Sequence, residues 1–481
     1  MLPGFKYSEH HVPSMGNHPD IIWITMDMVR ADHTSINDYS RETTPNLESI
    51  VSNSDVVNFP RCYSTHIKTF ASVPSMLTGL YPSCHGLGMG SGSPGQVPSE
   101  MLTVPDLLGD EGYYTLGVSN GWAGPGIGID ERFDKFVQPN MENLYKNPQI
   151  LLKYLTKLRT QGPGVSLDIS DHSEHMAYFR TEIAKRELKE AFGNSKPVFS
   201  YIHYFDTHDP FYPPKSLENE FTDTPAEAYE AATKQYENYY EIMYDLWDED
   251  SYQPNSEMNL ISSMYDSIIK HMDRNISELF DFIKQESEDA IVVITSDHGV
   301  HLGEQGLIGH RYALHDAAIH VPLIVSGLPE IGGSSESIVQ HIDIMQTILS
   351  TVNADVSQFQ GYDLRRQDRE YAISQLYNPD SYEELRDNHP KSKVWFDPQA
   401  KMTSVTGSEY KLVDWPDRDR FYKLPYENED ISESVPEIYS DYCDHLEKWM
   451  STYGQPFSET PDETELSEET ERELQDLGYL N

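Results

Sequence analysis

The chain alternates between short, continuous apolar runs and longer segments in which apolar and polar residues mix. A short run that is mostly apolar, without alternation between apolar and polar residues, predicts a strand buried on both faces of a sheet. Such runs occur at 21–25, 114–119, 198–205, 290–296 and 321–327. We expect them to be parallel strands of one sheet.

The segment 258–285 has a different pattern, because its apolar residues recur at spacings of three and four from Ile261 to Ile283. This periodicity predicts an amphipathic helix whose apolar face covers the core. Helical segments of this kind separate the apolar runs. The whole pattern therefore favours an α/β fold with a mainly parallel central sheet flanked by helices.

Residues suited to acid–base or metal chemistry directly follow three of the apolar runs. They are Asp27 after the first run, Asp206 and His208 after the third, and Asp297 and His298 after the fourth. Parallel strands have their carboxyl ends at one edge of the sheet, which is where ligands of such sheets bind. The sequence therefore predicts a metal-dependent active site at this edge.

The pattern changes at about residue 356, where short β-like pieces are separated by acidic and proline-containing turns. We therefore expect two domains. The catalytic domain covers 19–355, and a smaller α+β domain covers 356–481.

Composition adds a strong charge to this picture. The chain has 38% hydrophobic residues, as expected of a globular protein, but 79 Asp and Glu against 35 Lys and Arg give a formal net charge of −44. Such a surface repels a phosphate backbone, so we expect no nucleic-acid partner. Because the acidity is spread along the chain, it favours a halophilic protein whose self-repulsion is screened by molar salt.

Cysteine usage and hydropathy indicate the compartment. Cys62, Cys84 and Cys443 are few and odd in number, which favours free thiols over a disulfide framework. No apolar run has the length of a signal peptide core or a membrane span. We therefore expect a cytoplasmic protein that does not insert into membranes.

The order of motifs along most of the chain resembles that of the sulfatase family in the alkaline-phosphatase superfamily. The motifs are "IIWITMDMVRADHTS", "TTPNLESI", "TGLYPSCHG", "YFDTHDPFYPP", "ITSDHGVHLGEQGLIGH" and "HIDIMQTIL". This resemblance implies an alkaline-phosphatase-like fold and a metal-dependent ester hydrolase.

The resemblance also implies roles for individual residues. Asp27, Asp297 and His298 match the family's metal ligands, and this mixture of oxygen and nitrogen donors suits one divalent ion, with Mn, Zn, Mg and Ca not distinguished. His208 in "DTHDPF" matches the histidine that binds the anionic group or protonates the leaving oxygen. His310 occupies a similar place on another loop.

Four further residues are expected to contact the substrate. Arg30 and Arg311 would bind the remaining oxygens of the anion, with Arg311 near the family's usual Lys position. Asn120 stands where many sulfatases have the Lys of Lys-x-His, and Asp206 lies beside the matched His208.

Two alternatives concern the metal. Met28 stands where some family members have a second metal-binding Asp, which favours a single ion. Asp206, His208 and His310 leave open a second site like that of two-zinc phosphodiesterases.

The nucleophile segment departs from the family. Most sulfatases carry C/S-x-P-x-R, whose first residue is oxidised to formylglycine, but this chain has no such motif and no formylglycine is expected. Counting back without gaps from "LTGLYP" places the nucleophile on Thr69, which would also bind the metal. An alternative register through "SVPS" selects Ser72. Neither register keeps the Arg of C/S-x-P-x-R. Val73 stands at its position in the Thr69 register, and Met76 stands there in the Ser72 register.

A threonine cannot release sulfate or phosphate by collapsing to an aldehyde, so water or an acceptor must attack a second time. We therefore expect a metal-dependent hydrolase of sulfate or phosphate esters that forms a covalent intermediate on Thr69. One alternative is a phosphodiesterase or phospho-alcohol transferase acting on a glycan or lipid-linked substrate. The other is a non-catalytic, metal-bound glycan-binding protein.

Overall fold

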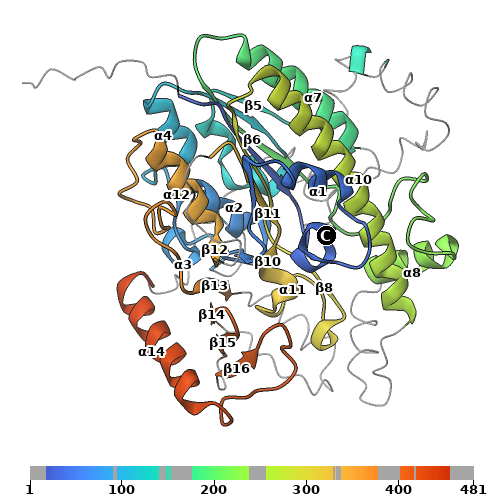
Figure 1. The fold of residues 1–481 in the computed structure, drawn as a ribbon, viewed down its shortest axis with the longest axis vertical. Helices are drawn as coiled ribbons and strands as arrows, with labels where there is room; N and C mark the ends of the chain where they lie inside the picture. Colours follow the sequence, from blue (N-terminus) through green and yellow to red (C-terminus); the bar gives the residue numbers. More distant parts are fainter. Residues whose placement is uncertain are drawn as a thin grey trace, which may run out of the picture.

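The computed structural model describes residues 18–89, 95–139, 148–150, 152, 176–237, 256–328, 331, 337–377, 401–415 and 419–454. A seven-stranded sheet crosses the centre of the molecule in the order β2-β11-β7-β1-β6-β4-β5 (Figure 1). Its strands are β1 (Ile21–Met26), β2 (Val56–Asn58), β4 (Tyr114–Val118), β5 (Lys135–Val137), β6 (Val198–Tyr204), β7 (Ile291–Ser296) and β11 (Leu323–Ser326). The five strands from β7 to β5 are parallel.

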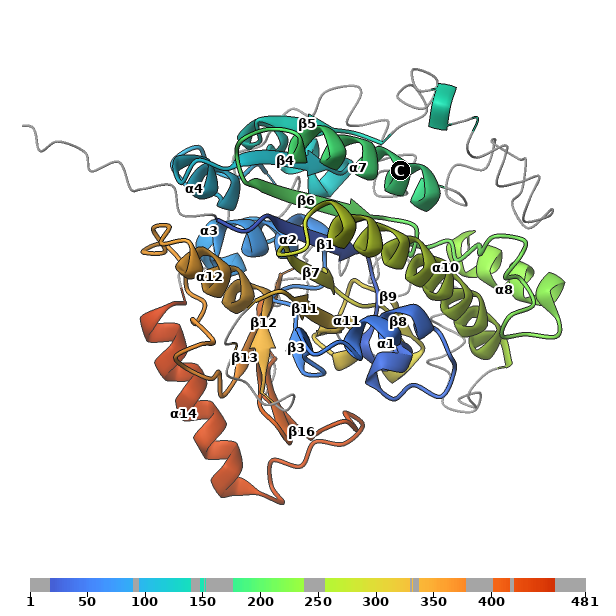
Figure 2. The ribbon, with the colours of Figure 1, turned by 45° about the horizontal axis from the view of Figure 1, so that its top comes forward.

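Helices cover both faces of this sheet (Figure 2). Every position of the central strands β1, β6 and β7 is buried, and successive side chains of a strand point to opposite faces. Ile22 and Ile24 of β1 share a core with α1, α7 and α10, whereas Ile21 and Trp23 share a core with α2, α4 and α12. These helices are α1 (Pro45–Val51), α7 (Met176–Phe192), α10 (Ser256–Glu286), α2 (Thr69–Thr78), α4 (Val104–Asp110) and α12 (His341–Thr351). The predicted fold class is therefore confirmed, and α10 is the helix expected at 258–285.

One expected strand runs in the opposite direction from the prediction. The run at 321–327 forms the end of β10 (His320–Val321) and then β11, which pairs antiparallel with β7. The chain leaves β7 at the carboxyl edge of the sheet and returns from that edge through α11 (Asp316–Ile319). A parallel strand would have required a crossover to the far edge.

A smaller antiparallel sheet lies beside the main one, in the order β13-β14-β15-β16. Its strands are β13 (Ala372–Tyr377), β14 (Lys401–Thr406), β15 (Tyr410–Asp414) and β16 (Arg420–Lys423). The helix α14 (Pro436–Thr452) packs on β14 and β15, around a core that includes Phe421 and Trp449. These elements form the expected α+β region, while the boundary at 355 stays a prediction.

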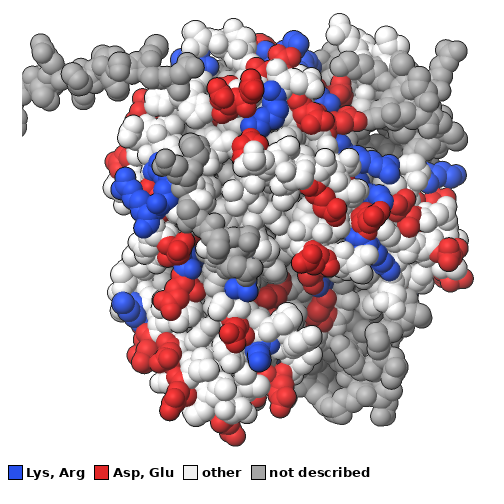
Figure 3. All heavy atoms as spheres, in the orientation of Figure 1, with Lys and Arg blue, Asp and Glu red and all other residues white. Residues whose placement is uncertain are grey.

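The remaining described elements are short or peripheral. They are β3 (Cys62–Tyr63), β8 (His301–Leu302), β9 (Ile308–Gly309), β12 (Val339–Gln340), α3 (Pro82–His85) and α8 (Pro225–Glu237). On the face shown in Figure 3, acidic side chains extend from top to bottom with basic side chains among them. Within the described residues, every helix falls short of the length and hydrophobicity that a bilayer crossing requires.

Candidate active site

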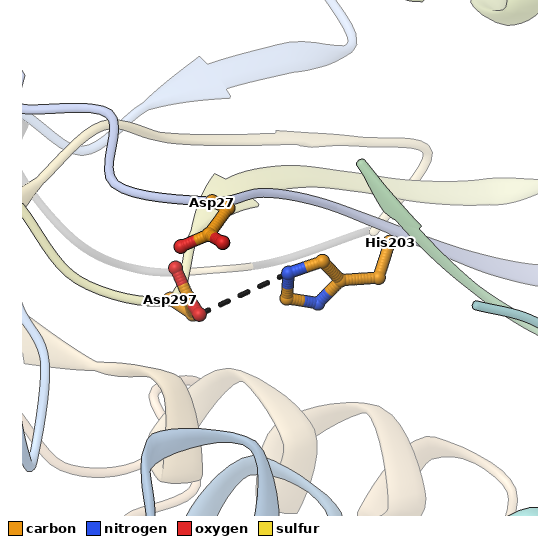
Figure 4. Close-up of side chains that lie close together, drawn as sticks. All are labelled: Asp27, His203 and Asp297. Carbon is orange, nitrogen blue, oxygen red and sulfur yellow. Dashed lines mark ion pairs between the residues drawn. The ribbon is translucent and has the colours of Figure 1, made fainter. Parts of the chain in front are cut away.

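Two buried carboxylates meet where the central strands end (Figure 4). Asp27 directly follows β1 and Asp297 directly follows β7, and these strands are parallel neighbours. The Asp27 amide donates to the Tyr204 carbonyl at 2.8 Å, and the Asp297 amide donates to the Met26 carbonyl at 3.2 Å. The ladder therefore extends one residue past each strand and holds both carboxylates at one edge, fully buried.

His298 adds an imidazole to this pair. Its Nδ1 lies 2.9 Å from the Gly299 carbonyl, which leaves Nε2 to face the carboxylates. Nε2 lies 3.6 Å from Asp27 Oδ1 and 3.7 Å from Asp297 Oδ2. The turn needs glycine at 299, since a Cβ there would lie 2.1 Å from the Ala317 carbonyl oxygen.

Thr69 is the hydroxyl that reaches this group. It is the first residue of α2, it is buried, and its Oγ1 lies 3.3 Å from His298 Nε2. The Ser72 hydroxyl instead donates to the Asp297 carbonyl at 2.7 Å and lies 3.0 Å from Ser64 Oγ. Ser72 thus ties α2 to the backbone of the turn, whereas the Thr69 hydroxyl contacts the imidazole nitrogen of His298 that faces the carboxylates.

The cysteines lie apart from this chemistry. All three are free thiols in the structure, and Cys62 is buried in β3. Burial and the nearby charge of Asp343 raise the pKa of Cys62 well above its usual value. A thiol held protonated in this way is a poor nucleophile.

His203 also belongs to the group, although the sequence analysis missed it. It lies in β6, with Nε2 3.8 Å from Asp297 Oδ2 and Nδ1 2.8 Å from the Tyr201 hydroxyl (Figure 4). His203, Asp27 and Asp297 each offer a ligand atom within 4.8 Å of the others. The sequence pattern singles out only residues that follow a strand, and therefore not a histidine inside an apolar run.

These residues fit a divalent cation. Among the described residues, Asp297 Oδ2 and His203 Nε2 are buried polar atoms that lack a hydrogen-bond partner. Burial lowers the pKa of His203 to about 4 and also lowers that of His298, with Asp297 opposing both shifts. The imidazoles therefore offer lone pairs and no positive charge. Two carboxylates buried side by side are costly, and a metal ion would offset their negative charge.

Two further histidines stack above His298. The ring of His310 is stacked on that of His298 at 4.7 Å, and the His208 ring meets His310 edge-on at 5.6 Å. Burial lowers the pKa of His310 well below its usual value, and the charges of His298 and His208 add to this. Burial also lowers the pKa of His208, but Asp209 and Asp27 outweigh it and raise that pKa to about 9. His208 is thus the protonated member of the stack.

Arg30 and Asp206 each form ion pairs with charged side chains of the protein. The Arg30 guanidinium forms ion pairs with Asp32 at 2.7 Å and Glu304 at 2.6 Å. Asp206 pairs with Arg180 at 2.5 Å and accepts from the amide of Ala177, in the first turn of α7. Both side chains therefore have ion-pair partners within the protein. Substrate contact by Arg30 and Asp206, and a second ion at Asp206, His208 and His310, stay predictions.

The other predicted contacts lie on loops around the carboxylates. Asn120 follows β4 at the same edge of the sheet and is buried. Arg311 follows His310, and its charge helps to lower the pKa of Asp209. Lys68, which the sequence analysis did not single out, directly precedes Thr69 and lies 5.4 Å from the centre of the Phe70 ring. Substrate contact by any of these residues stays a prediction.

Comparison with known proteins gives consistent results. A family model described as Sulfatase matches residues 19–354. The phosphonate monoester hydrolase of Agrobacterium radiobacter is similar with a TM-score of 0.68, at 16% identity, over 90% of this chain and 96% of that chain. The enzyme SpPMH of Silicibacter pomeroyi has a TM-score of 0.64 at 18% identity, over 90% and 96%. BT4656, solved with its substrate D-glucosamine-2-N,6-O-disulfate, has a TM-score of 0.64 at 16% identity, over 93% and 100%.

The solved structures share the α/β fold of this chain, and the matched family model defines the chain as a hydrolase of sulfate or phosphate esters. Within that class, the chain belongs to the sulfatase family.

Proposed function

We propose that this protein hydrolyses a sulfate, phosphate or phosphonate ester through a covalent intermediate on Thr69, with one divalent ion held by Asp27, Asp297 and His298. The observation that carries the proposal is the position of Thr69 Oγ1, 3.3 Å from His298 Nε2 beside the two buried carboxylates. When bound, the ion would lower the pKa of the Thr69 hydroxyl and offset negative charge on the transferred group.

Thr69 is well placed to attack. It begins a helix of 10 residues, whose N-terminal dipole favours negative charge on the hydroxyl oxygen and on the bound anion. In the first step Thr69 Oγ forms a bond to sulfur or phosphorus, while the bond to the ester oxygen breaks. In the second step water attacks the same atom and Thr69 Oγ leaves, which regenerates the hydroxyl and releases the acid.

His208 is suited to protonate the leaving oxygen. Asp209 contacts its Nδ1 through the backbone carbonyl at 2.8 Å and the carboxylate at 3.0 Å, which orients the ring and keeps it charged. A histidine whose pKa lies near 9 carries its proton at neutral pH and can donate it as the ester bond breaks.

The choice between sulfate and phosphate chemistry depends on the missing aldehyde. A formylglycine enzyme expels sulfate without a second attack at sulfur, which a threonine cannot do. The similar phosphonate monoester hydrolases and the sulfated sugar bound to BT4656 show both chemistries on this fold. We expect turnover of an aryl phosphodiester or phosphonate monoester to exceed that of the matched aryl sulfate.

Intact-mass analysis of protein quenched during turnover tests the proposal. We expect an added phosphoryl or sulfo mass on the peptide that contains Thr69, and no adduct in Thr69→Ala. Ser72→Ala is the matched control, because it removes a hydroxyl three residues further along α2 and should keep the adduct. An adduct on Ser72 would overturn the assignment of the nucleophile.

The same experiment separates the alternatives. Product release only in the presence of an acceptor alcohol would support a transferase. Ion binding without an adduct or turnover on either substrate would support a non-catalytic binding protein.

A further inference from the structure

His203 occupies an unusual position for a core histidine. It is fully buried in the middle of the sheet, and its register partner in β1 is Thr25, two residues before Asp27. The 3.8 Å between its Nε2 and Asp297 Oδ2 is too long for a hydrogen bond. In the part of the chain that the structure describes, neither of these two atoms has a hydrogen-bond partner.

The separations around the carboxylates fit ligands of a common ion. Two atoms that each lie about 2.1 Å from one ion can be at most about 4.2 Å apart. The Nε2 of His203 meets this limit with Asp297, and the Nε2 of His298 meets it with both Asp27 and Asp297. In the sheet order β7-β1-β6, Asp27 comes from the middle strand and one histidine comes from each side.

The hydrogen bond at Nδ1 of His203 leaves its Nε2 able to bind a metal ion. A ligating Nε2 needs its lone pair, so Nδ1 must carry the proton and donate it to the Tyr201 hydroxyl oxygen 2.8 Å away. That oxygen has two lone pairs and can accept the bond. A hydrogen bond from the second nitrogen is the usual way in which proteins orient a histidine ligand.

We propose that His203 is a ligand of the active-site ion, so that the site contains two imidazoles and selects a first-row transition metal over calcium. This inference rests on the proposed function, because it concerns the same ion. Calcium and magnesium prefer all-oxygen sites, whereas imidazole suits zinc, iron and related ions. The reaction would then proceed with manganese, cobalt or zinc, and calcium would be a poor substitute.

X-ray absorption spectroscopy of the zinc-loaded full-length protein tests the inference directly. We expect two coordinated imidazoles in the wild type and one in His203→Gln. In equilibrium dialysis against zinc and calcium together, with metal content measured by mass spectrometry, we expect His203→Gln to lose at least about tenfold in zinc affinity. Its calcium affinity should change far less.

His341→Gln provides the matched control. His341 is an equally buried imidazole, but its Nε2 lies 3.0 Å from Thr295 Oγ1 and is not part of the carboxylate group. This variant should keep two imidazoles and the zinc affinity of the wild type.

One bound zinc with a single imidazole in the wild type would overturn the inference and leave the proposed function standing. His203 would then be a buried neighbour of Asp297 that does not bind the ion. This count needs no variant, so it holds even if His203→Gln fails to fold. A wild type that binds no ion would overturn both the inference and the metal dependence of the proposed function.

Discussion

Two buried clusters of charge in this protein differ in where the positive charge comes from. In the first, Lys411 of β15 lies 2.7 Å from Asp316 and 2.9 Å from Glu427, and Lys411 is fully buried. The Asp316 amide also donates to Glu427 at 2.7 Å. This cluster fastens the small sheet to α11, and the chain itself supplies the cation.

The second cluster is the active site, where Asp27 and Asp297 are equally buried and the adjacent imidazoles of His203 and His298 have lowered pKa values. Buried carboxylates therefore serve a structural ion pair in the first cluster and a candidate metal site in the second. A side-chain cation satisfies its carboxylates permanently, whereas carboxylates that face neutral imidazoles leave room for an exchangeable ion.

The largest expected effect follows from removing one active-site carboxylate. Asp297→Asn keeps the oxygen that accepts from the amides of Met28 and His298 but replaces the one that faces the histidines. We expect loss of the bound ion and a fall in kcat/KM of at least about a thousandfold. Without metal, the variant should melt no lower than the wild type, because repulsion between two buried charges is relieved. Calorimetry in chelator checks this, and a strongly destabilised metal-free variant would contradict it.

Removing the cation of the Lys411 cluster should lower the stability of the protein, in contrast to Asp297→Asn. Lys411→Met leaves the buried Glu427 and the partly buried Asp316 without their cation, and we expect a loss of about 3–5 kcal/mol in the free energy of unfolding. Denaturant titration measures this. Lys423→Met, at an exposed position of the same sheet, should stay within about 0.5 kcal/mol of the wild type. A loss below about 1 kcal/mol in Lys411→Met would mean that the cluster contributes little to stability.

A smaller effect concerns pH. In metal-free protein, Asp209 and Asp27 overcome burial and raise the pKa of His208 from 6.5 to about 9. The protonated form is therefore stabilised by folding. This contribution is complete below pH 6.5 and is lost as pH rises through about 9, on the order of 3 kcal/mol at most. The melting temperature in chelator should fall over this range more steeply in the wild type than in His208→Gln. If the melting temperatures of the wild type and His208→Gln fall in parallel with pH, folding does not raise the pKa of His208.

The smallest expected effect is the response of the Lys411 cluster to salt, compared with that of the exposed charges. Salt screens exposed charges far more than buried ones, so molar KCl should raise the melting temperature of this highly acidic chain. The stability difference between the wild type and Lys411→Met should change by less than about 0.5 kcal/mol. A difference that shrinks markedly with salt would place the Lys411 cluster in contact with solvent.

Much of the site followed from the sequence because strand ends can be recognised locally. Asp27, Asp297 and His298 come directly after continuous apolar runs, and the structure brings them together at one edge of the sheet. His203 could not be assigned in this way. It lies inside such a run, where only the neighbouring strands show that its imidazole faces a carboxylate.

What the sequence by itself determined was the α/β architecture and the edge of the sheet that bears the chemistry, because periodicity and chain direction are local properties. Only the tertiary structure decided which charges meet. Arg30 pairs with Glu304, 274 residues away, and Asp206 pairs with Arg180 of α7. The energy of a buried charge depends on its nearest partner in space, and that partner comes from a distant part of the chain.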